Sequence, residues 1–295
     1  MLGRTNAVTG GSKVTIDGEK VKGELSLTSE IVDYIEGSAP DGFGSGEAVV
    51  FENQIHIFSG SSQKHYKWDG VSWVAASTPP FGAEYATMAV FNGAIHALGC
   101  SATTSKRKYH YKWDGTTWTE LPNLPGAISI KTGVVAYNDK LYVIDIGDYM
   151  YSWDGASWNR EESSCKIAQI GSSGMYISPV IYDGKIHILG TGASTSNRTG
   201  HYKLTGNQWT EVSTIPYNAF SAVALVLDGN IHILNGNNTP NHYKWNGTVW
   251  TKLPDLPSSY NGIPMAVYKS RIHYLTSTTH YTIQNGKYVH TTIKM

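Results

Sequence analysis

Histidine and aspartate recur along this chain in one short phrase, and both residue types can bind metal ions or transfer protons. The first copy runs from His65 to Gly70 and reads His-Tyr-Lys-Trp-Asp-Gly; five later copies keep parts of it. Ten of the eleven histidines occupy two repeated positions, which are His56, His96, His187, His232 and His273, and His65, His110, His201, His242 and His280. A metal site needs ligands that converge on one point, whereas repeated positions are distributed around a structure. We therefore expect no metal and no other cofactor.

Acid-base or nucleophilic catalysis receives little support from the rest of the sequence. We find no Ser-His-Asp set, no glycine-rich phosphate loop and no obvious pair of carboxylates. The acids expected in variable segments are Glu84, Asp148, Glu161 and Glu162. Their positions do not predict the two closely placed carboxyl groups that glycoside hydrolysis uses. We expect a protein that is not an enzyme, and an enzyme of polysaccharide or sialic-acid chemistry is the alternative.

Charge and composition exclude several further classes of protein. The chain has 295 residues, with 23 Lys and Arg balanced by 23 Asp and Glu, so a nucleic-acid partner gains no global electrostatic support. Cys100 and Cys165 have neither metal-binding nor redox spacing. Residues 1–30 contain no apolar stretch of signal-peptide length, and no segment has the apolar length that crosses a bilayer. We expect neither a signal peptide nor membrane insertion.

A repeat of about 40 to 46 residues organises the chain from residue 45 onwards. Equivalent positions of the six copies are Ile55, Ile95, Leu141, Ile186, Ile231 and Ile272. This period is typical of propeller blades, each a sheet of four strands. Three copies place Asn-Gly or Asp-Gly after the first strand, at Asn92-Gly93, Asp183-Gly184 and Asp228-Gly229, which is the preferred chemistry of a two-residue hairpin. The sequence therefore predicts an all-β, six-bladed β-propeller over residues 45–295.

Aromatic residues also follow the repeat. The third strand of a blade carries Trp68, Trp113, Trp153 or Trp245, and the fourth strand begins with Trp73, Trp118, Trp158, Trp209 or Trp250, which together are all nine tryptophans. Because aromatic side chains bury large areas between stacked sheets, we predict that they pack the blades and do not bind a ligand. Residues 287–294 are the predicted fourth strand of the last blade, so closure of the ring is expected to need no N-terminal strand.

These positions resemble the kelch family of β-propellers. That family has a Tyr near the end of the third strand and a Trp early in the fourth, as in Tyr111 with Trp118 and Tyr243 with Trp250. Its glycine pair after the second strand is reduced to one glycine, at Ser59-Gly60, Gly99-Cys100, Gly190-Thr191 and Asn235-Gly236. The resemblance implies the fold and not the function, because propellers host enzymes, adaptors and receptors.

One face of the predicted propeller carries the irregular loops, and we place the ligand site there. Ten positions before each reference residue, at the mouth of the axial channel, lie Ser45, Tyr85, Lys131, Tyr176, Ser221 and Gly262. Positive charge and aromatic groups are expected around this ring, from Lys106, Arg107, Lys108, Arg198, Phe81, Tyr217, Phe220 and Tyr260. Tyrosine, lysine and serine at such a mouth can stack on a polar ligand and form hydrogen bonds with it. We predict ligand binding by these residues, apart from Ser45 and Gly262.

The first 44 residues lie outside the repeat. Gly3-Arg4-Thr5-Asn6 and the glycines that follow resemble the start of tail and tail-fibre proteins of phages and prophages of Gram-positive bacteria. Residues 13–16 and 21–27 are predicted to form a hairpin around Asp17-Gly18. Residues 25–35 could instead begin a short helix, and residues 38–46 form a linker. We interpret residues 1–44 as an attachment segment.

Together these observations predict a six-bladed kelch-like β-propeller with an N-terminal attachment segment, acting in non-catalytic recognition. The resemblance implies a phage or prophage tail component, a receptor-binding protein located in the virion, or in the bacterial cytoplasm before assembly. Its expected partners are a bacterial cell-surface glycan or protein and, through residues 1–44, other tail or baseplate proteins, with homo-oligomerisation left open. A kelch-type adaptor for protein interactions is the remaining alternative.

Overall fold

The computed structural model describes residues 15–16, 19–20, 33–38, 40, 46–59, 63–82, 86–100, 103, 107–129, 132–145, 150–161, 177–192, 198–257, 259, 263–276 and 279–284. All regular elements in these ranges are β-strands. In the part of the chain so described, no helix is long and apolar enough to cross a membrane.

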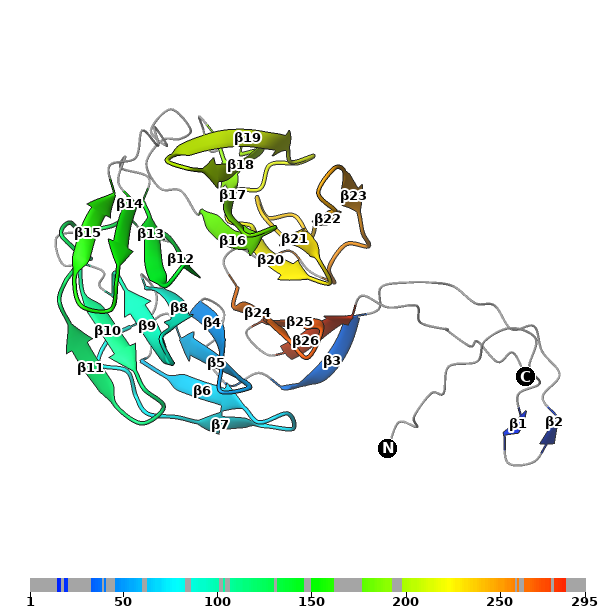
Figure 1. Cartoon of the computed structure of the whole chain (residues 1–295). Coiled ribbons are helices and arrows are strands. Elements are labelled where there is room, and N and C mark those ends of the chain that lie inside the picture. Colours follow the sequence, from blue (N-terminus) through cyan, green and yellow to red (C-terminus); the bar gives the residue numbers. More distant parts are fainter. Residues whose placement is uncertain are drawn as a thin grey trace.

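Six antiparallel sheets of four strands form a six-bladed β-propeller, as the repeat predicted (Figure 1). Blades 1 to 3 consist of β4 (Gly46–Phe51), β5 (Gln54–Ser59), β6 (His65–Trp68) and β7 (Trp73–Ala75); β8 (Thr87–Phe91), β9 (Ala94–Leu98), β10 (His110–Trp113) and β11 (Trp118–Leu121); and β12 (Gly133–Tyr137), β13 (Lys140–Ile144), β14 (Met150–Trp153) and β15 (Trp158–Glu161). Blades 4 and 5 consist of β16 (Ser178–Tyr182), β17 (Lys185–Thr191), β18 (Gly200–Thr205) and β19 (Gln208–Thr214); and β20 (Val223–Leu227), β21 (Asn230–Leu234), β22 (His242–Trp245) and β23 (Trp250–Lys252). Blade 6 consists of β24 (Met265–Tyr268), β25 (Arg271–Leu275), β26 (Thr279–Gln284) and β3 (Asp33–Ser38).

The first strand of each blade lines the axis of the propeller. Each of these strands contacts the first strand of the next blade, and β24 contacts β4, which closes the ring. The first strands are short and rich in small and apolar residues, as in Thr87–Phe91 with the sequence TMAVF. Such strands suit a position that is covered on both sides by neighbouring blades.

The outer edge of blade 6 corrects two predictions. Its fourth strand is β3, which pairs with β26 through Thr279 and Ser38 at one end and Ile283 and Asp33 at the other. The expectation that residues 287–294 would form this strand was wrong; those residues lie outside the described ranges. Residues 33–38 were expected to belong to the attachment segment, with a short helix as the alternative for those up to residue 35. In the structure they form a strand of the propeller. The N-terminal part of the chain therefore joins the last blade to the first.

A two-stranded sheet precedes β3 in the sequence. It consists of β1 (Thr15–Ile16) and β2 (Glu19–Lys20), with Thr15 opposite Lys20 and Ile16 opposite Glu19. This pairing confirms the predicted hairpin around residues 17–18. The predicted second strand of that hairpin, residues 21–27, lies outside the described ranges.

Tight turns join the first two strands of every blade. Asn92 and Gly93 have φ angles of 45° and 69°, and Asp183 with Gly184 and Asp228 with Gly229 repeat this pattern. A two-residue hairpin of type I′ requires positive φ at both positions, so the Asn-Gly and Asp-Gly predictions are confirmed. The other three blades achieve the same turn without glycine, for example with Glu52 and Asn53 at 47° and 57°.

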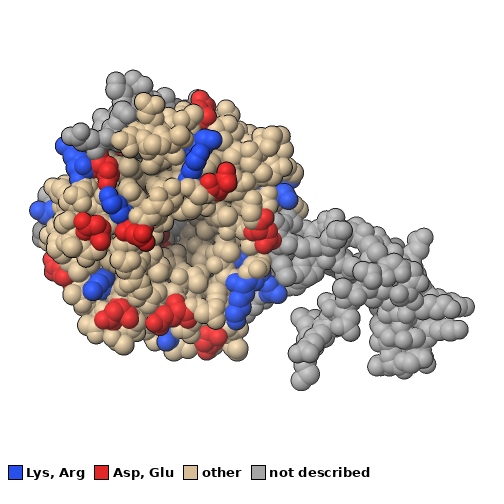
Figure 2. Space-filling view, in the orientation of Figure 1, with Lys and Arg blue, Asp and Glu red and all other residues tan. Residues whose placement is uncertain are grey.

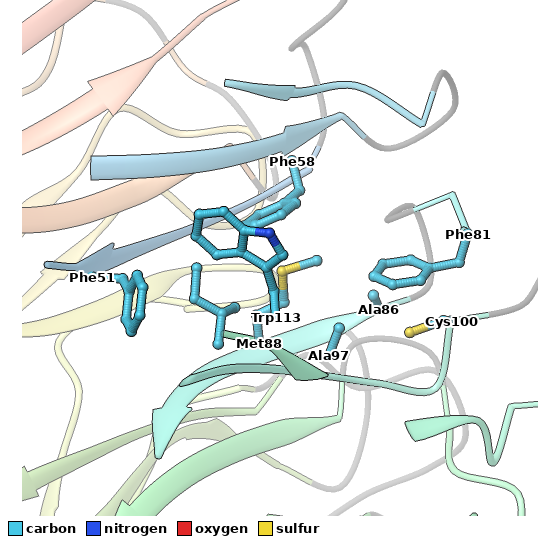
Figure 3. Close-up of a cluster of buried hydrophobic side chains, with 9 residues drawn as sticks. Phe51, Phe58, Phe81, Ala86, Met88, Ala97, Cys100 and Trp113 are labelled. Atoms are coloured by element: carbon cyan, nitrogen blue, oxygen red, sulfur yellow. The ribbon is translucent and has the colours of Figure 1, made fainter. Parts of the chain in front are cut away.

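Six hydrophobic clusters hold the propeller together, one at each boundary between blades. Figure 3 shows the cluster between blades 1 and 2, in which Trp113 lies against Phe58 and Met88. The third-strand tryptophans Trp68, Trp113, Trp153 and Trp245 are at most 4% exposed. Each also pairs across the hairpin with the Trp that opens the fourth strand, as Trp113 does with Trp118. The packing role predicted for the tryptophans is thereby confirmed.

Candidate functional site

The repeated histidines form pairs inside the blades. The Nδ1 atom of the second-strand His lies 2.8–2.9 Å from the Nε2 atom of the third-strand His in five blades, in the pairs His56–His65, His96–His110, His187–His201, His232–His242 and His273–His280. All ten imidazoles are buried. Because the two nitrogen atoms of each pair share one hydrogen bond, they are not free to coordinate a metal ion together. Within the described residues, no group of three or more His, Cys, Asp or Glu side chains could hold a metal.

Burial keeps these imidazoles neutral. Desolvation is the main cause that lowers the pKa of His96 to about 4 and that of His110 to about 3. The neighbouring Lys112 lowers the pKa of His96 further, and His96 does the same to His110. In blade 1, His65 Nδ1 lies 3.2 Å from the Ser77 carbonyl oxygen, which can only accept a hydrogen bond. Nδ1 of His65 therefore donates to Ser77, and its Nε2 accepts the hydrogen bond from His56 Nδ1. Each pair is a structural hydrogen bond in which one ring must offer an unprotonated nitrogen as the acceptor.

The aspartates of the repeated phrase cap a turn. Asp114 Oδ1 accepts hydrogen bonds from the backbone N–H groups of Thr116 and Thr117, each at 2.9 Å. These bonds lower the pKa of Asp114 to about 2. Asp69, Asp154 and Asn246 form the same turn in blades 1, 3 and 5. The phrase therefore builds the blade, and its acids are not available as a catalytic set.

A cavity of about 200 Å³ lies on the propeller axis, where the six first strands begin. We call it the axial cavity, and its lining comprises Gly46, Glu47, Ala48, Thr87, Met88, Thr132, Gly133, Val134, Ile177, Ser178, Pro179, Ser221, Ala222, Val223, Ala224, Ile263, Pro264 and Met265. All six blades contribute to it. The connections that enter the first strands share this face with the loops between second and third strands, so the cavity opens towards the irregular loops.

Hydroxyl groups dominate the polar lining of the axial cavity. Thr132 Oγ1 donates to Ser129 O at 2.8 Å and lies 3.1 Å from Asp145 Oδ1, which also accepts from the Ser129 amide. Ser178 Oγ accepts from the Ala224 backbone amide of the next blade at 2.8 Å. Fixed hydroxyls of this kind can form directed hydrogen bonds to a polar ligand.

Glu47 adds a carboxylate to the axial cavity, and it is the acidic side chain among the described residues that line it. On the face drawn in Figure 2, acidic and basic side chains alternate around a central hollow, and neither sign forms a continuous field there.

The sequence located the axial cavity to within about two residues. Of the predicted ring, Ser221 lines the cavity and is 3% exposed. Tyr85, Lys131 and Tyr176 lie outside the described residues, as do Ser45 and Gly262. Sequence reasoning missed Glu47, Thr87 and Ser178, which lie one or two positions further into the first strands. A polar residue at or near the start of an otherwise apolar first strand, as Thr87 and Ser178 are, was the signal for them.

Arg198, in the loop between β17 and β18, contacts Phe220 on the link between blades 4 and 5, and the same link carries Tyr217. The Arg198 guanidinium lies 5.6 Å from the centre of the Phe220 ring, and the Arg198 carbonyl accepts from the Ala219 amide at 2.9 Å. Arg198 is 0% exposed, and burial lowers its pKa. Tyr217 donates to the Asn235 carbonyl at 2.6 Å, stacks on Tyr243, and has its pKa raised by burial. Arg198 and Tyr217 support the loops from inside.

The remaining predicted residues lie elsewhere. Phe81 is 4% exposed and packs between Tyr111 and Trp118, so it has no surface to offer a ligand. The Arg107 and Lys108 carbonyls accept from Ile128 and Leu124, which ties their loop to the following link. Lys106 and Tyr260 lie outside the described residues.

Of the acids weighed for catalysis, Glu161 lies on β15. There it accepts a hydrogen bond from the buried Ser152 hydroxyl and lies 3.5 Å from Lys140. Glu84, Asp148 and Glu162 lie outside the described residues. The position of Glu161 on the outer strand of blade 3 separates it from the axial cavity.

Comparison with known proteins supports the fold. No family model matches this chain, and no curated protein sequence does. The solved structure of YjhT is similar, with a TM-score of 0.67 and 15% sequence identity over 84% of this chain and 99% of that one. It is among 810 matching chains of solved structures, a breadth that indicates a common architecture and not one activity. What this chain shares with the YjhT structure is the six-bladed β-propeller.

Proposed function

We propose that this chain is a non-catalytic recognition protein that binds a small polar group, such as the terminal sugar of a bacterial surface glycan, in the axial cavity. One observation carries the proposal: the six first strands meet around a cavity of about 200 Å³ that is lined by hydroxyl groups and the Glu47 carboxylate. Concave sites with a few fixed polar groups are where small ligands usually bind.

The biological setting of this proposal is the tail of a phage or prophage. It is supported by the resemblance of Gly3-Arg4-Thr5-Asn6 to the start of tail proteins. In this setting the segment before β3 attaches the chain to other tail or baseplate proteins, and the propeller contacts the bacterial surface. The kelch-like type of the propeller is supported by its paired Tyr and Trp positions.

The competing function is hydrolysis or another modification of a sugar. Glu47 favours it, because a carboxylate in a small cavity can act as a general acid or base. The lining offers no second acid among the described residues, whereas most glycoside hydrolases use two. Recognition is therefore the function that the cavity supports better.

Binding to an array of bacterial surface polysaccharides, with a parallel assay for released sugar, separates the two functions. We expect binding without sugar release. Glu47→Gln and Thr87→Val should each weaken binding several-fold, because each removes a polar group from the cavity lining. Glu120→Gln is the matched control, since Glu120 is exposed on β11 in the outer part of blade 2.

Two results would overturn the proposal. Sugar release that Glu47→Gln abolishes would make the chain an enzyme. Equal binding by wild type and both cavity variants would place the ligand elsewhere on the propeller. The double substitution Tyr85→Ala and Tyr176→Ala tests separately the ring that was predicted from the sequence.

A further inference from the structure

A second cavity lies between blades 4 and 5, at the end of the propeller opposite to the axial cavity. Its volume is about 590 Å³, within the range of sites for small ligands. We call it the interblade groove, and the residues that matter here are Tyr182, Asp183, Lys185, His187, Lys203 and Trp245. The same first strand β16 reaches both cavities, with Ser178 at the axial cavity and Tyr182 at the groove.

Tyr182 differs from its counterparts in other blades. Tyr137 and Tyr268 end the first strands of blades 3 and 6, and their hydroxyls donate at 2.8 Å to the first hairpin turn of the following blade, at Gly184 O and Asn53 O. The Tyr182 hydroxyl makes no such bond to any residue that the structure describes. Its ring lies 5.2 Å from that of the buried Trp245, and the half-buried Tyr182 ring forms the aromatic wall of the groove.

Trp245 adds a polar group that is buried but has no partner. Its side chain is 4% exposed, and its Nε1 atom has no hydrogen-bond partner among the described residues. Trp113, the equivalent residue between blades 1 and 2, shares this property, but the residue opposite it is Phe51, which has no hydroxyl. Both N–H groups are enclosed within their blade boundaries, so Trp245 supports the Tyr182 ring from inside.

Charged side chains surround the aromatic wall. Lys185 and Lys203 contribute two ammonium groups and Asp183 one carboxylate, so the lining carries an excess of positive charge. All three act on the buried His187, whose pKa is lowered to about 4, chiefly by burial. Lys203 and Lys185 lower this pKa further, whereas Asp183 raises it.

We propose that the interblade groove binds an acidic saccharide, a pyranose ring that carries a carboxylate. The apolar face of such a ring fits the Tyr182 ring, and Lys185 and Lys203 suit the carboxylate. Ring hydroxyls can accept from the Tyr182 hydroxyl and donate to Asp183. A neutral sugar lacks the charged partner, and an inorganic anion lacks the apolar face. This site goes beyond the proposed function and does not depend on it.

Titration of the full chain with an oligogalacturonate, followed by calorimetry, tests the proposal. Lys203→Ala should weaken binding at least about tenfold, the effect of one charge-assisted hydrogen bond. Tyr182→Phe should weaken it less, because only a hydroxyl is lost and Phe already occupies this position in blade 1. Lys67→Ala is the matched control, because Lys67 lies opposite His56 across two strands of blade 1 as Lys203 lies opposite His187 in blade 4. This variant should bind the ligand as tightly as the wild type does.

A second measurement locates the ligand. In a two-dimensional NMR spectrum, the indole N–H signal that is missing in Trp245→Phe should shift on titration, and Glu47→Gln in the axial cavity should not change that shift. Three results would overturn the proposal: no binding of the oligogalacturonate, equal losses in Lys203→Ala and Lys67→Ala, or equally tight binding of neutral maltotriose. Thermal melting of each variant shows whether a loss of binding reflects unfolding.

Discussion

The imidazole of His110 stands edge-on to the indole of Trp153 in the next blade, with ring centroids 5.0 Å apart and ring planes at 89°. The same arrangement joins His65 to Trp113, His201 to Trp245 and His280 to Trp68. Blade 3 has Met150 in place of the His, and blade 4, which it faces, has Leu204 in place of the Trp; both lie in one hydrophobic cluster. At the boundary of blades 5 and 6 the His is kept as His242, whereas Ile283 takes the place of the Trp. Four of the six boundaries keep both rings, and we infer that the two rings form one packing unit where both are present.

Replacing the His110–Trp153 pair by the Met and Leu that occupy these positions between blades 3 and 4 should reveal the coupling. We expect His110→Met and Trp153→Leu each to destabilise the protein, the first because it also removes the hydrogen bond from His96. The double variant should be more stable than the sum of the two effects predicts, by about 0.5–1.5 kcal/mol. Urea unfolding of the four proteins measures this energy. The pair His110→Met and Trp245→Leu, in separate parts of the ring, should be additive within about 0.5 kcal/mol.

Mild acid should unfold the propeller cooperatively. Nine paired histidines have pKa values lowered to about 3 or 4. Between the unfolded pKa of about 6.5 and these values the unfolded chain binds more protons than the folded one, so stability falls as the pH is lowered. Each histidine contributes about 1.4 kcal/mol per pH unit, and nine contribute on the order of 10 kcal/mol, comparable to the stability of a whole domain.

Tryptophan fluorescence and circular dichroism from pH 8 to pH 4 measure this transition. We expect its midpoint between about pH 5 and 6, with an uptake of several protons on unfolding. His56→Tyr combined with His65→Met introduces the residues of blade 3 and should reduce that uptake by about two protons. A folded protein at pH 4 would contradict the neutral-pair interpretation.

The blades could be predicted from sequence because their signals are local. A turn such as Asn92-Gly93 and a phrase such as Tyr111 to Asp114 each specify their own hairpin. The partner of β26 could not be read in this way, because ring closure joins residues about 250 positions apart and Asp33–Ser38 has no apolar alternation that marks a blade strand. The histidine pairs were missed for a related reason: the repeat fixes each position along a strand, whereas the contact between His56 and His65 depends on the register of two strands.

The role of β3 in closure predicts the effect of N-terminal deletions. Removal of residues 1–38 takes away the outer strand of blade 6 and exposes the edge of β26, so we expect aggregation or loss of the cooperative thermal transition. Removal of residues 1–32 leaves β3 in place and should preserve that transition. Size-exclusion chromatography and calorimetry of both shortened proteins make the comparison. A stable chain that begins at residue 39 would show that closure needs no strand from the N-terminus.

The Ser178 hydroxyl connects the first strands of blades 4 and 5 by accepting the Ala224 backbone amide at 2.8 Å. Ala224 is 4% exposed, so Ser178→Ala leaves its amide without this acceptor where little water reaches it. We expect a loss of about 1–3 kcal/mol in the free energy of unfolding, measured in urea. Ser178→Thr keeps the hydroxyl on a residue that favours strands and should be close to wild type. Equal stability of the alanine and threonine variants would mean that water in the axial cavity replaces the serine, and the connection between these strands would then rest on apolar packing alone.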